Sequence, residues 1–275
     1  MNERAFSAIP LNQRSTKPRS RGLTEIRGPY YSVMGRRYLE DILDTMHPYV
    51  DGLKFAGGSF ALMPREKVAE MIDLAHRHAV YVSTGGWIEH VLRHGADAVE
   101  KYLAEAKAVG FDVIELSTGF ITIPDDDLLR LVGRVAKAGL KPKPELGIQF
   151  GAGGGATPVA ELAAEGTRDA QWVIRRARAC LDAGAHMIMI ESEGITENVD
   201  TWRTDVVAQI IDGLGTEKVM FEAADPLVFE WYIKNYGAEA NLFVDHSQIV
   251  QLECLRSGIW GTKSSWGRVV TYKSG

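Results

Sequence analysis

The feature that most constrains the fold is a regular alternation of short β-rich runs with longer amphipathic segments. Glycines that close helical patterns, at Gly110, Gly139, Gly184 and Gly237, precede several of the runs, as expected for helix C-caps in a βα series. Eight units in one series predict an α/β fold, a single (β/α)8 TIM barrel; an open doubly wound sheet is the main alternative. The eight predicted strands span residues 23–27, 51–55, 79–84, 112–117, 142–148, 186–192, 218–223 and 241–245.

Nothing in the composition divides the chain into parts. Its 275 residues suit one large barrel, and no linker separates two domains, so we predict one barrel domain over residues 21–275. Residues 1–20 contain basic residues but no apolar stretch typical of a secretory signal. We therefore expect a disordered N-terminal tail, with a transit peptide as the alternative.

Charge and cysteine content exclude several classes of function. The net charge is −5, and no Lys/Arg cluster is interleaved with aromatic residues, so we expect no nucleic-acid partner. The apolar runs are too short to span a membrane, so we expect no membrane partner either. Cys180 and Cys254 lie far apart and suggest a reducing compartment, for which we expect the cytoplasm. Homo-oligomers are common among such barrels, but no apolar stripe identifies an interface here.

Acidic residues stand at the ends of five successive predicted strands. They are Glu115, Glu145, Glu191, Glu222 and Asp245. A single acid after an apolar run is usually a solvated strand end or a helix cap, but in a TIM barrel these strand ends form the active-site mouth. Carboxylates gathered there repel one another, and a divalent cation offsets the repulsion. Oxygen ligands of this kind suit Mg²⁺ or Mn²⁺ better than zinc.

The fifth predicted strand is unusually polar and leads into a glycine run, in the stretch "KPKPELGIQFGAGGGAT". Alternate residues share a strand face, so Lys141, Lys143, Glu145 and Gly147 should face the barrel interior, with Lys143 beside Glu145 at the mouth. A structural ion pair is the alternative role for these two. The prolines remove ladder donors, so we expect the start of this strand to be loosely paired on one side. The glycine run matches no phosphate-binding motif; we expect a loop, with a lid over the mouth as the alternative.

Short motifs in a fixed order carry a resemblance to a known family. They are "LKFAGGS", "TGGWIE", "IELSTG", "PELG", "MIESEG", "MFEAA", "NLF" and "LECLRSG". With these motifs, the chain resembles the phosphosulfolactate synthase family over nearly all of its length after residue 20. The segments "IESEGITENVDTWR" and "NLFVDHSQIVQLECLR" resemble the branch that contains plant heat-stress-associated proteins.

The resemblance implies a (β/α)8 barrel and a Mg²⁺-dependent addition of sulfite to phosphoenolpyruvate. The positions that match the family pattern are Lys54, Gly85, Gly86, Glu115, Glu145, Glu191 and Glu222. Three family cations are missing. Ile148 and Gln149 replace a lysine pair, no arginine separates Glu191 from Gly194, and Trp260 stands where an arginine is expected. Each lost charge-assisted bond would weaken anion binding by roughly 1.5–3 kcal/mol unless it is replaced.

In an enzyme of this type, we expect three groups of site residues. Glu145, Glu191 and Glu222 would hold Mg²⁺. A small anionic substrate would be bound by Lys54, Gly85, Gly86 and Ser117. The catalytic group would comprise Lys143 as the general acid, His246 as the second candidate for that role, and Glu115.

Two other functions remain open at this stage. The barrel could act on a less anionic substrate without using sulfite, which would explain the altered cations. Alternatively, the chain could be a non-catalytic heat-stress-associated protein that acts by binding other proteins. A ring of mutually repelling carboxylates has no physical purpose in a scaffold, which favours the enzyme.

Overall fold

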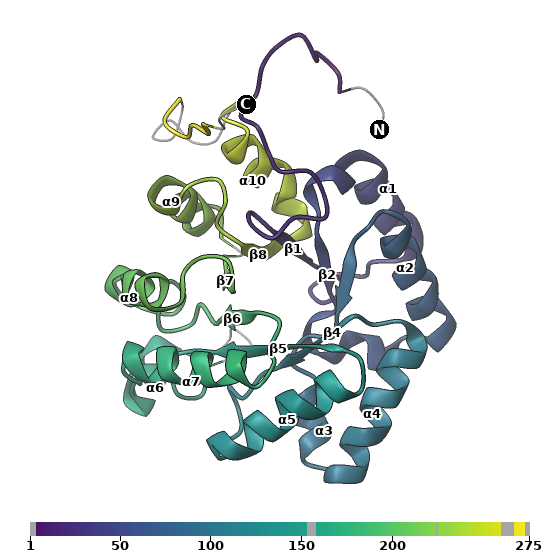
Figure 1. Cartoon of the computed structure of the whole chain (residues 1–275), viewed down its shortest axis with the longest axis vertical. Coiled ribbons are helices and arrows are strands. Elements are labelled where there is room, and N and C mark those ends of the chain that lie inside the picture. Colours follow the sequence, from purple (N-terminus) through teal and green to yellow (C-terminus); the bar gives the residue numbers. More distant parts are fainter. Residues whose placement is uncertain (1–3, 153–157, 224, 260–266, 273–275) are drawn as a thin grey trace.

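Eight parallel strands close into a barrel, which confirms the predicted (β/α)8 fold (Figure 1). The computed structural model describes residues 4–152, 158–223, 225–259 and 267–272. Each strand pairs with the next in the sequence, and the eighth pairs with the first. The strands are β1 (Thr24–Arg27), β2 (Gly52–Lys54), β3 (Tyr81–Ser83), β4 (Val113–Leu116), β5 (Lys141–Leu146), β6 (Ile188–Ile190), β7 (Val219–Glu222) and β8 (Leu242–Asp245).

Helices surround the barrel and bury their apolar faces against it (Figure 1). In α2, for example, Val68, Met71, Ile72 and Ala75 recur at helical spacing and are buried. The described residues include the short 3₁₀ helices η1 (His47–Tyr49), η2 (Ala56–Leu62) and η3 (His246–Gln248). The α-helices are α1 (Arg36–Met46), α2 (Arg65–Arg77), α3 (Ile88–Leu92), α4 (Ala96–Val109), α5 (Asp125–Lys137), α6 (Val159–Glu165), α7 (Ala170–Asp182), α8 (Thr204–Leu214), α9 (Pro226–Tyr236) and α10 (Ile249–Arg256).

The barrel interior is part apolar and part charged. A small cluster of buried apolar residues, which includes Met189, Met220 and Phe243, is separate from the larger core that the helices cover. Because alternate residues share a strand face, Met189 and Glu191 project to the same side of their strand. The charged residues therefore lie above this apolar layer, towards the C-terminal ends of the strands.

The polar strand β5 is paired unequally on its two sides, as the prolines predicted. Its pairing with β4 begins at Lys141, whereas its ladder with β6 begins only at Glu145. Lys141 is exposed at the start of the strand, while Lys143 is fully buried. Of the residues predicted to face inward on this strand, Lys141 therefore does not reach the mouth, whereas Glu145 does.

Residues 12–19 pack against the opposite end of the barrel, so this part of the N-terminal segment differs from the disordered tail expected for residues 1–20. Arg19 Nε lies 3.0 Å from Asp51 Oδ1, and Arg14 Nε lies 3.0 Å from Glu253 Oε1. The ammonium of Lys17 donates to three backbone carbonyls, those of His47, Val50 and His78. Burial of both ends of these ion pairs explains why residues 12–19 follow a defined path.

Two sequence features fall partly or wholly outside the described residues. Residues 153–157 of the glycine run and Trp260 belong to this group. Among the residues that the structure describes, no helix has the length and apolar character needed to cross a membrane.

Candidate active site

A cavity of about 390 Å³ opens at the C-terminal ends of the barrel strands. Its floor is charged and its rim is aromatic, with Tyr30, Tyr31, Trp87 and Phe120 among the lining residues. Residues from β1, β2, β4, β5, β7 and β8, together with the segments that follow β3 and β6, reach this cavity. The place agrees with the expectation that TIM-barrel active sites lie at this face.

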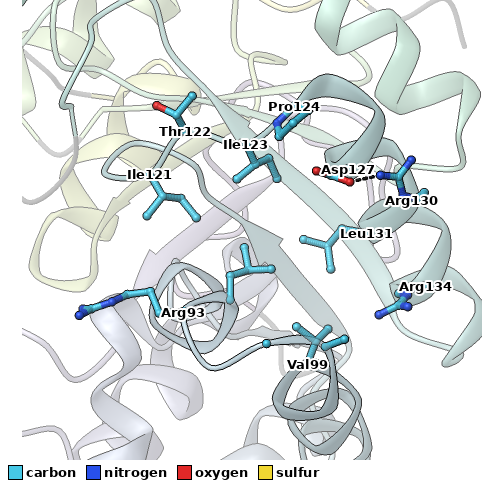
Figure 2. A pocket seen from close by; sticks show the side chains of 13 residues that line it. Arg93, Val99, Ile121, Thr122, Ile123, Pro124, Asp127, Arg130, Leu131 and Arg134 are labelled. Carbon is cyan, nitrogen blue, oxygen red and sulfur yellow. Dashed lines mark hydrogen bonds and ion pairs between the residues drawn. The ribbon is translucent and has the colours of Figure 1, made fainter.

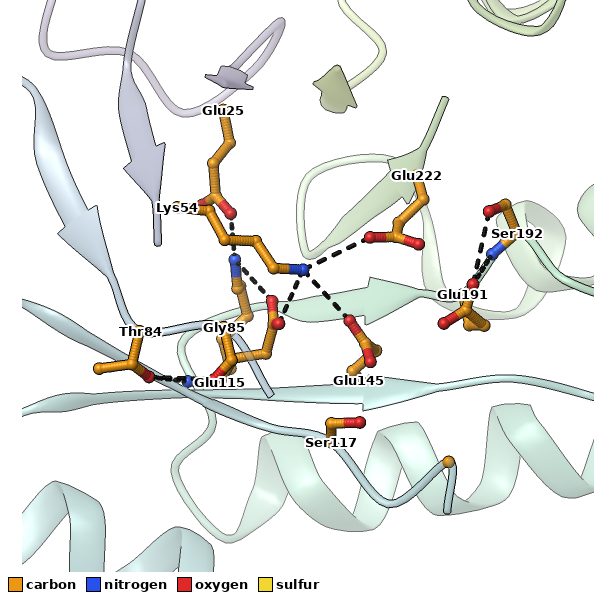
Figure 3. A network of polar contacts seen from close by, with 12 residues as sticks. Glu25, Lys54, Thr84, Gly85, Glu115, Ser117, Glu145, Glu191, Ser192 and Glu222 are labelled. Carbon is orange, nitrogen blue, oxygen red and sulfur yellow. Dashed lines mark hydrogen bonds and ion pairs between the residues drawn. The ribbon is translucent and has the colours of Figure 1, made fainter. Parts of the chain in front are cut away.

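Lys54 is the central cation of the site. Figure 3 shows its side chain extending from β2 to a point between three glutamates. Its Nζ lies 2.7 Å from Glu115 Oε1, 3.3 Å from Glu145 Oε2 and 3.4 Å from Glu222 Oε1. Burial disfavours the charged ammonium, but the surrounding carboxylates outweigh this effect and raise the pKa of Lys54 well above its ordinary value. Lys54 is therefore a permanent positive charge at the mouth.

A second lysine lies deeper in the barrel. Lys143 Nζ lies 2.5 Å from Glu25 Oε1 and 3.2 Å from Glu115 Oε2. The predicted pairing of Lys143 with Glu145 is therefore wrong, and Lys143 pairs with Glu25 and Glu115 instead. Successive inward-facing residues of a tilted strand lie at different depths in the barrel. Lys143 lies level with Glu25 on β1, and its partner Glu115 connects it to Lys54.

The carboxyl groups of the mouth differ in their protonation. Burial raises the pKa of Glu115, but the ammonium groups of Lys54 and Lys143 outweigh it and hold the pKa below its ordinary value. Burial, reinforced by the charge of Glu115, raises the pKa of Glu145 to about 8. Burial and the neighbouring carboxyls of Glu222 and Glu145 raise the pKa of Glu191 well above its ordinary value. Ionised and neutral acids therefore stand side by side.

Carboxyl groups outnumber cations at this mouth. Among the described residues that line the cavity, the only lysine and arginine are Lys54 and Arg27. Arg27 Cζ lies 4.8 Å from the centre of the Tyr31 ring and 5.0 Å from that of Phe243. The glutamates that line the same cavity are Glu89, Glu115, Glu145, Glu191, Glu193, Glu197 and Glu222.

Glu89 fixes the loop that follows β4. Ser117 Oγ and the backbone N–H groups of Gly119 and Phe120 all donate to its carboxylate. Ser117 also lies next to the carboxyl of Glu145, and its polar hydroxyl opposes the rise in the pKa of that group. Ser117 therefore links the glutamate cluster to the rim.

The predicted glycines allow close approach of neighbouring backbone segments. Gly85 has a φ of +64°, and a Cβ there would lie 2.8 Å from the carbonyl oxygen of Phe55. Gly86 lines the cavity, and a Cβ on it would lie 3.1 Å from the Cβ of Ser117. Both glycines hold the segment after β3 against its neighbours.

His246 lies beside the cavity and not among the residues that line it. Its Nδ1 is 2.9 Å from the carbonyl oxygen of Arg27, and its ring packs edge-on against Tyr38 with the ring centres 5.4 Å apart. It lines a neighbouring recess that shares Arg27, Tyr31 and Glu197 with the mouth. His246 would act on a ligand only from that side.

The sequence matches a family model described as (2R)-phospho-3-sulfolactate synthase (ComA) over residues 12–262. The chain belongs to the phosphosulfolactate synthase family. It is 44% identical over 252 residues to Protein HEAT-STRESS-ASSOCIATED 32 of Arabidopsis thaliana, covering 88% of each chain. It is 28% identical over 255 residues to Phosphosulfolactate synthase of Methanothermobacter thermautotrophicus, covering 90% of this chain and 93% of that protein.

Among solved structures, the fold is similar to the carboxyl transferase domain from Rhizobium etli pyruvate carboxylase. The TM-score is 0.59 at 14% identity, with 91% of this chain and 46% of that chain covered. The chain thus spans less than half of that structure, and at this identity the likeness shows only the fold.

Two positions at which this chain departs from the family pattern have structural roles. Ile148 is fully buried in the core. The side-chain amide of Gln149 donates to the carbonyl oxygens of Phe150, Leu162 and Gly166. These contacts hold the segment after β5 to α6, so neither residue supplies the charge of the missing lysine pair.

Two arginines that the sequence analysis did not select lie close to the glutamates. A small recess beside the mouth is lined by Glu145 and Glu191 together with Arg168 and Arg176. Arg176 pairs with Asp125, with 3.1 Å between Nε and Oδ1. Arg168 stacks over Phe150, with its Cζ 4.0 Å from the ring centre. Arg168 therefore places a positive charge in the recess next to Glu145 and Glu191.

Glu145, Glu191 and Glu222 suit Mg²⁺ as a pair of ligands but not as a set of three. In the described part of the chain, no group of three acidic, His or Cys side chains is arranged to hold a metal ion. Glu145 and Glu222 both face Lys54, whereas Glu191 lies beside these two carboxyls, and burial together with their charges raises its pKa. Mg²⁺ commonly uses only one or two carboxylates together with substrate phosphate and water. The pair Glu191 and Glu222 fits that pattern, since a cation would relieve the repulsion that now raises the pKa of Glu191.

Other residues of the site that were missed at the sequence level include Glu25, Arg27 and Glu89. Glu25 and Arg27 belong to the first predicted strand, "LTEIR", where an acid inside an apolar run was a usable signal. Glu89 belongs to the family motif "TGGWIE", but it lies on a helix and not at a strand end. A search restricted to strand ends could not find it.

Proposed function

We propose that this chain is a lyase that adds sulfite, or a related nucleophile, to phosphoenolpyruvate or a similar small enolic anion. The observation that carries the proposal is the buried ammonium of Lys54, held between Glu115, Glu145 and Glu222 at the barrel mouth of a phosphosulfolactate synthase family member. A fixed cation at this point suits a reaction in which negative charge develops on the substrate carboxylate.

The proposed reaction requires a cation and a proton donor. The sulfur lone pair of sulfite attacks the methylene carbon, the C–S bond forms, and the electrons of the carbon–carbon double bond move towards the carboxylate. Lys54 stabilises the resulting enolised carboxylate, and Arg27 at the cavity wall binds a second anionic group. A proton then adds to the central carbon, and the phosphate ester remains intact.

Glu145 is the proton donor that the geometry favours. Its side chain lines the cavity, and its raised pKa of about 8 keeps it protonated at neutral pH. Once deprotonated, its carboxylate faces the ammonium of Lys54. Lys143, the donor expected from the sequence, contacts Glu115 and does not line the cavity, so it would act only through that residue.

In this proposal, Glu191 and Glu222 would hold Mg²⁺ once the substrate supplies further oxygen ligands. When bound, the ion would add positive charge next to the enolised carboxylate and the phosphate.

Turnover of phosphoenolpyruvate with sulfite and Mg²⁺, followed by ³¹P NMR, tests the proposal. We expect a new phosphate-ester signal with the wild-type protein. Removing a general acid typically costs about 10²–10⁴-fold in rate, so we expect a loss of that order in Glu145→Gln. Lys54→Met removes the central ammonium and should also lose activity. Its matched control is Lys67→Met, which removes an exposed lysine on α2.

Three outcomes separate the parts of the proposal. Absence of the product signal with folded wild-type protein would refute sulfite addition to phosphoenolpyruvate. Full activity of Glu145→Gln would refute only the assignment of the proton donor. Full activity of Lys54→Met would show that the central ammonium is not used.

A second candidate is a barrel enzyme with a less anionic substrate. The seven glutamates of the cavity, set against Arg27 and Lys54, favour a ligand with fewer negative charges than phosphoenolpyruvate and sulfite together.

The name of the Arabidopsis relative further supports a role in heat stress. If the protein neither turns over a substrate nor binds Mg²⁺, a non-catalytic role in heat stress, through binding of other proteins, would be favoured.

A further inference from the structure

A second pocket lies on the outer layer of the barrel, between the N-terminal part of α4 and α5. Its volume is about 540 Å³, which is within the range of roughly 300–1,000 Å³ typical of small-molecule sites. None of its lining residues also lines the mouth. We name it the α4–α5 pocket, and it is a separate site from the glutamate cluster.

Apolar side chains form the floor of the α4–α5 pocket. Val99 and Leu131 are buried there, and Leu92, Ile121 and Ile123 are half-buried beside them. They come from two sides, the α3–α4 region on one side and α5 with the segment that leads into it from β4 on the other (Figure 2). An apolar group that entered the pocket would contact Val99 and Leu131, which are already buried, and would cover the half-buried Leu92, Ile121 and Ile123 from water. This burial is favourable in proportion to the area covered.

Arginines surround this apolar floor. Figure 2 shows Arg93 on one side of the apolar side chains and Arg130 and Arg134 on the other. Arg130 pairs with Asp127, and Arg134 Nη1 lies 3.3 Å from Glu100 Oε1. Within the described parts of the chain, the guanidinium of Arg93 makes no ion pair or hydrogen bond, so a charged donor remains available.

The charge of the pocket is opposite to that of the chain and of the mouth. Its lining contains three arginines and one acid, Asp127, whereas the whole chain has a net charge of −5. The three arginines of this rim attract an anion. An apolar floor with a cationic rim matches a ligand that has an apolar body and an anionic head.

We propose that the α4–α5 pocket binds a small amphipathic organic anion, with its apolar body against Val99 and Leu131 and its anionic head at Arg93 or Arg134. The complementarity of charge and the size of the pocket together favour this occupant over a neutral or cationic one. The site does not depend on the reaction proposed for the mouth.

Isothermal titration with decanoate tests the proposal, using the full chain at low ionic strength. We expect one site per chain, competition with the fluorescent anion 8-anilinonaphthalene-1-sulfonate, and no binding of decyltrimethylammonium, which has the same chain with a cationic head. The double variant Arg93→Gln/Arg134→Gln should bind decanoate roughly five- to tenfold more weakly, since exposed charge pairs contribute up to about 1 kcal/mol each.

Arg37→Gln is the matched control, because Arg37 is an exposed arginine on α1, away from the pocket. Its affinity for decanoate should equal that of the wild type. Equal affinities of the wild type and the double variant would overturn the proposal, as would binding of decanoate and the cation with the same affinity. Ala96→Phe, which adds a ring to the pocket lining, gives an independent check: unchanged decanoate binding in this variant would also refute the site.

Discussion

The site depends on single side chains whose charges are set by their neighbours. Lys54 keeps its proton because three carboxylates face it, and Glu115 keeps its negative charge because two ammonium groups face it. Glu145 and Glu191 lie where carboxyls outnumber cations, and their pKa values are raised. One cluster thus provides both a fixed cation and a neutral acid, which are the two groups that an addition to an enolic anion requires.

Replacement of Glu145 by glutamine should change how stability depends on pH. The pKa of this carboxyl rises from 4.5 to about 8 on folding, so between these values the native protein holds a proton that the unfolded chain releases. The free energy of unfolding should therefore fall as pH rises through this window, by up to about 1.4 kcal/mol per pH unit. Glu145→Gln removes that contribution, and its stability should vary less with pH.

Urea unfolding between about pH 5 and about pH 7.5, with a chelator present, measures this slope. Glu66→Gln, at an exposed position of α2, is the control and should follow the wild type. Identical slopes for the wild type and Glu145→Gln would contradict a raised pKa of this carboxyl.

At the residue scale, the sequence predicted the members of the site better than their partners. Lys54, Glu115, Glu145, Glu191 and Glu222 do converge at the mouth. The contacts of Lys143 with Glu25 and of Ser117 with Glu89 could not be predicted, because they join distant segments at depths that the barrel tilt determines. No spacing along the chain contains that information.

At the scale of elements, patterns within a segment were informative, and contacts between segments were not. The prolines of β5 predicted its one-sided pairing, and the apolar spacing in α2 predicted its buried face. Both Thr167 and Asp169 precede α7 and are residue types that cap helices, so the sequence alone favours Thr167 as readily as Asp169. The cap is Asp169, whose carboxylate accepts from the backbone N–H of Gln171, because Thr167 forms a bridge with Gln149.

This difference gives a test of the α7 cap. Asp169→Ala should lower the free energy of unfolding by about 1 kcal/mol, since it leaves a backbone N–H of the first turn without its partner. Thr167→Ala should change it far less, because Thr167 is exposed and takes part through its backbone. Chemical denaturation of both variants measures the effect, and a larger loss in Thr167→Ala would contradict the assignment of the cap to Asp169.

For the whole molecule, the two ends of the barrel carry different charged networks. The C-terminal mouth gathers glutamates around Lys54, whereas the N-terminal end buries Arg14, Arg19 and Arg256 with Asp51 and Glu253. Arg256 is fully buried and donates to the backbone carbonyls of Gly22 and Ala240, which stand at the starts of β1 and β8. The N-terminal network therefore ties residues 12–19 and α10 to the starts of the strands, whereas the C-terminal mouth gathers like charges.

The sequence predicted this architecture because the βα repeat is a local pattern repeated eight times. It did not predict the docking of residues 12–19 at the N-terminal end, because the segment has no periodic pattern and is held by ion pairs with distant residues. It also gave no sign of the α4–α5 pocket, whose arginines belong to two helices and look like ordinary solvated charges along the chain.

The central claim is that the glutamates of the mouth form a site for a metal-assisted reaction of an enolic anion. Isothermal titration of the protein with Mg²⁺, without and then with phosphoenolpyruvate, tests it most directly. We predict weak binding of Mg²⁺ alone and tighter binding in the presence of phosphoenolpyruvate, because Glu191 and Glu222 supply only part of the coordination. Glu191→Gln/Glu222→Gln should abolish the tightening. Absence of Mg²⁺ binding under both conditions would contradict the claim.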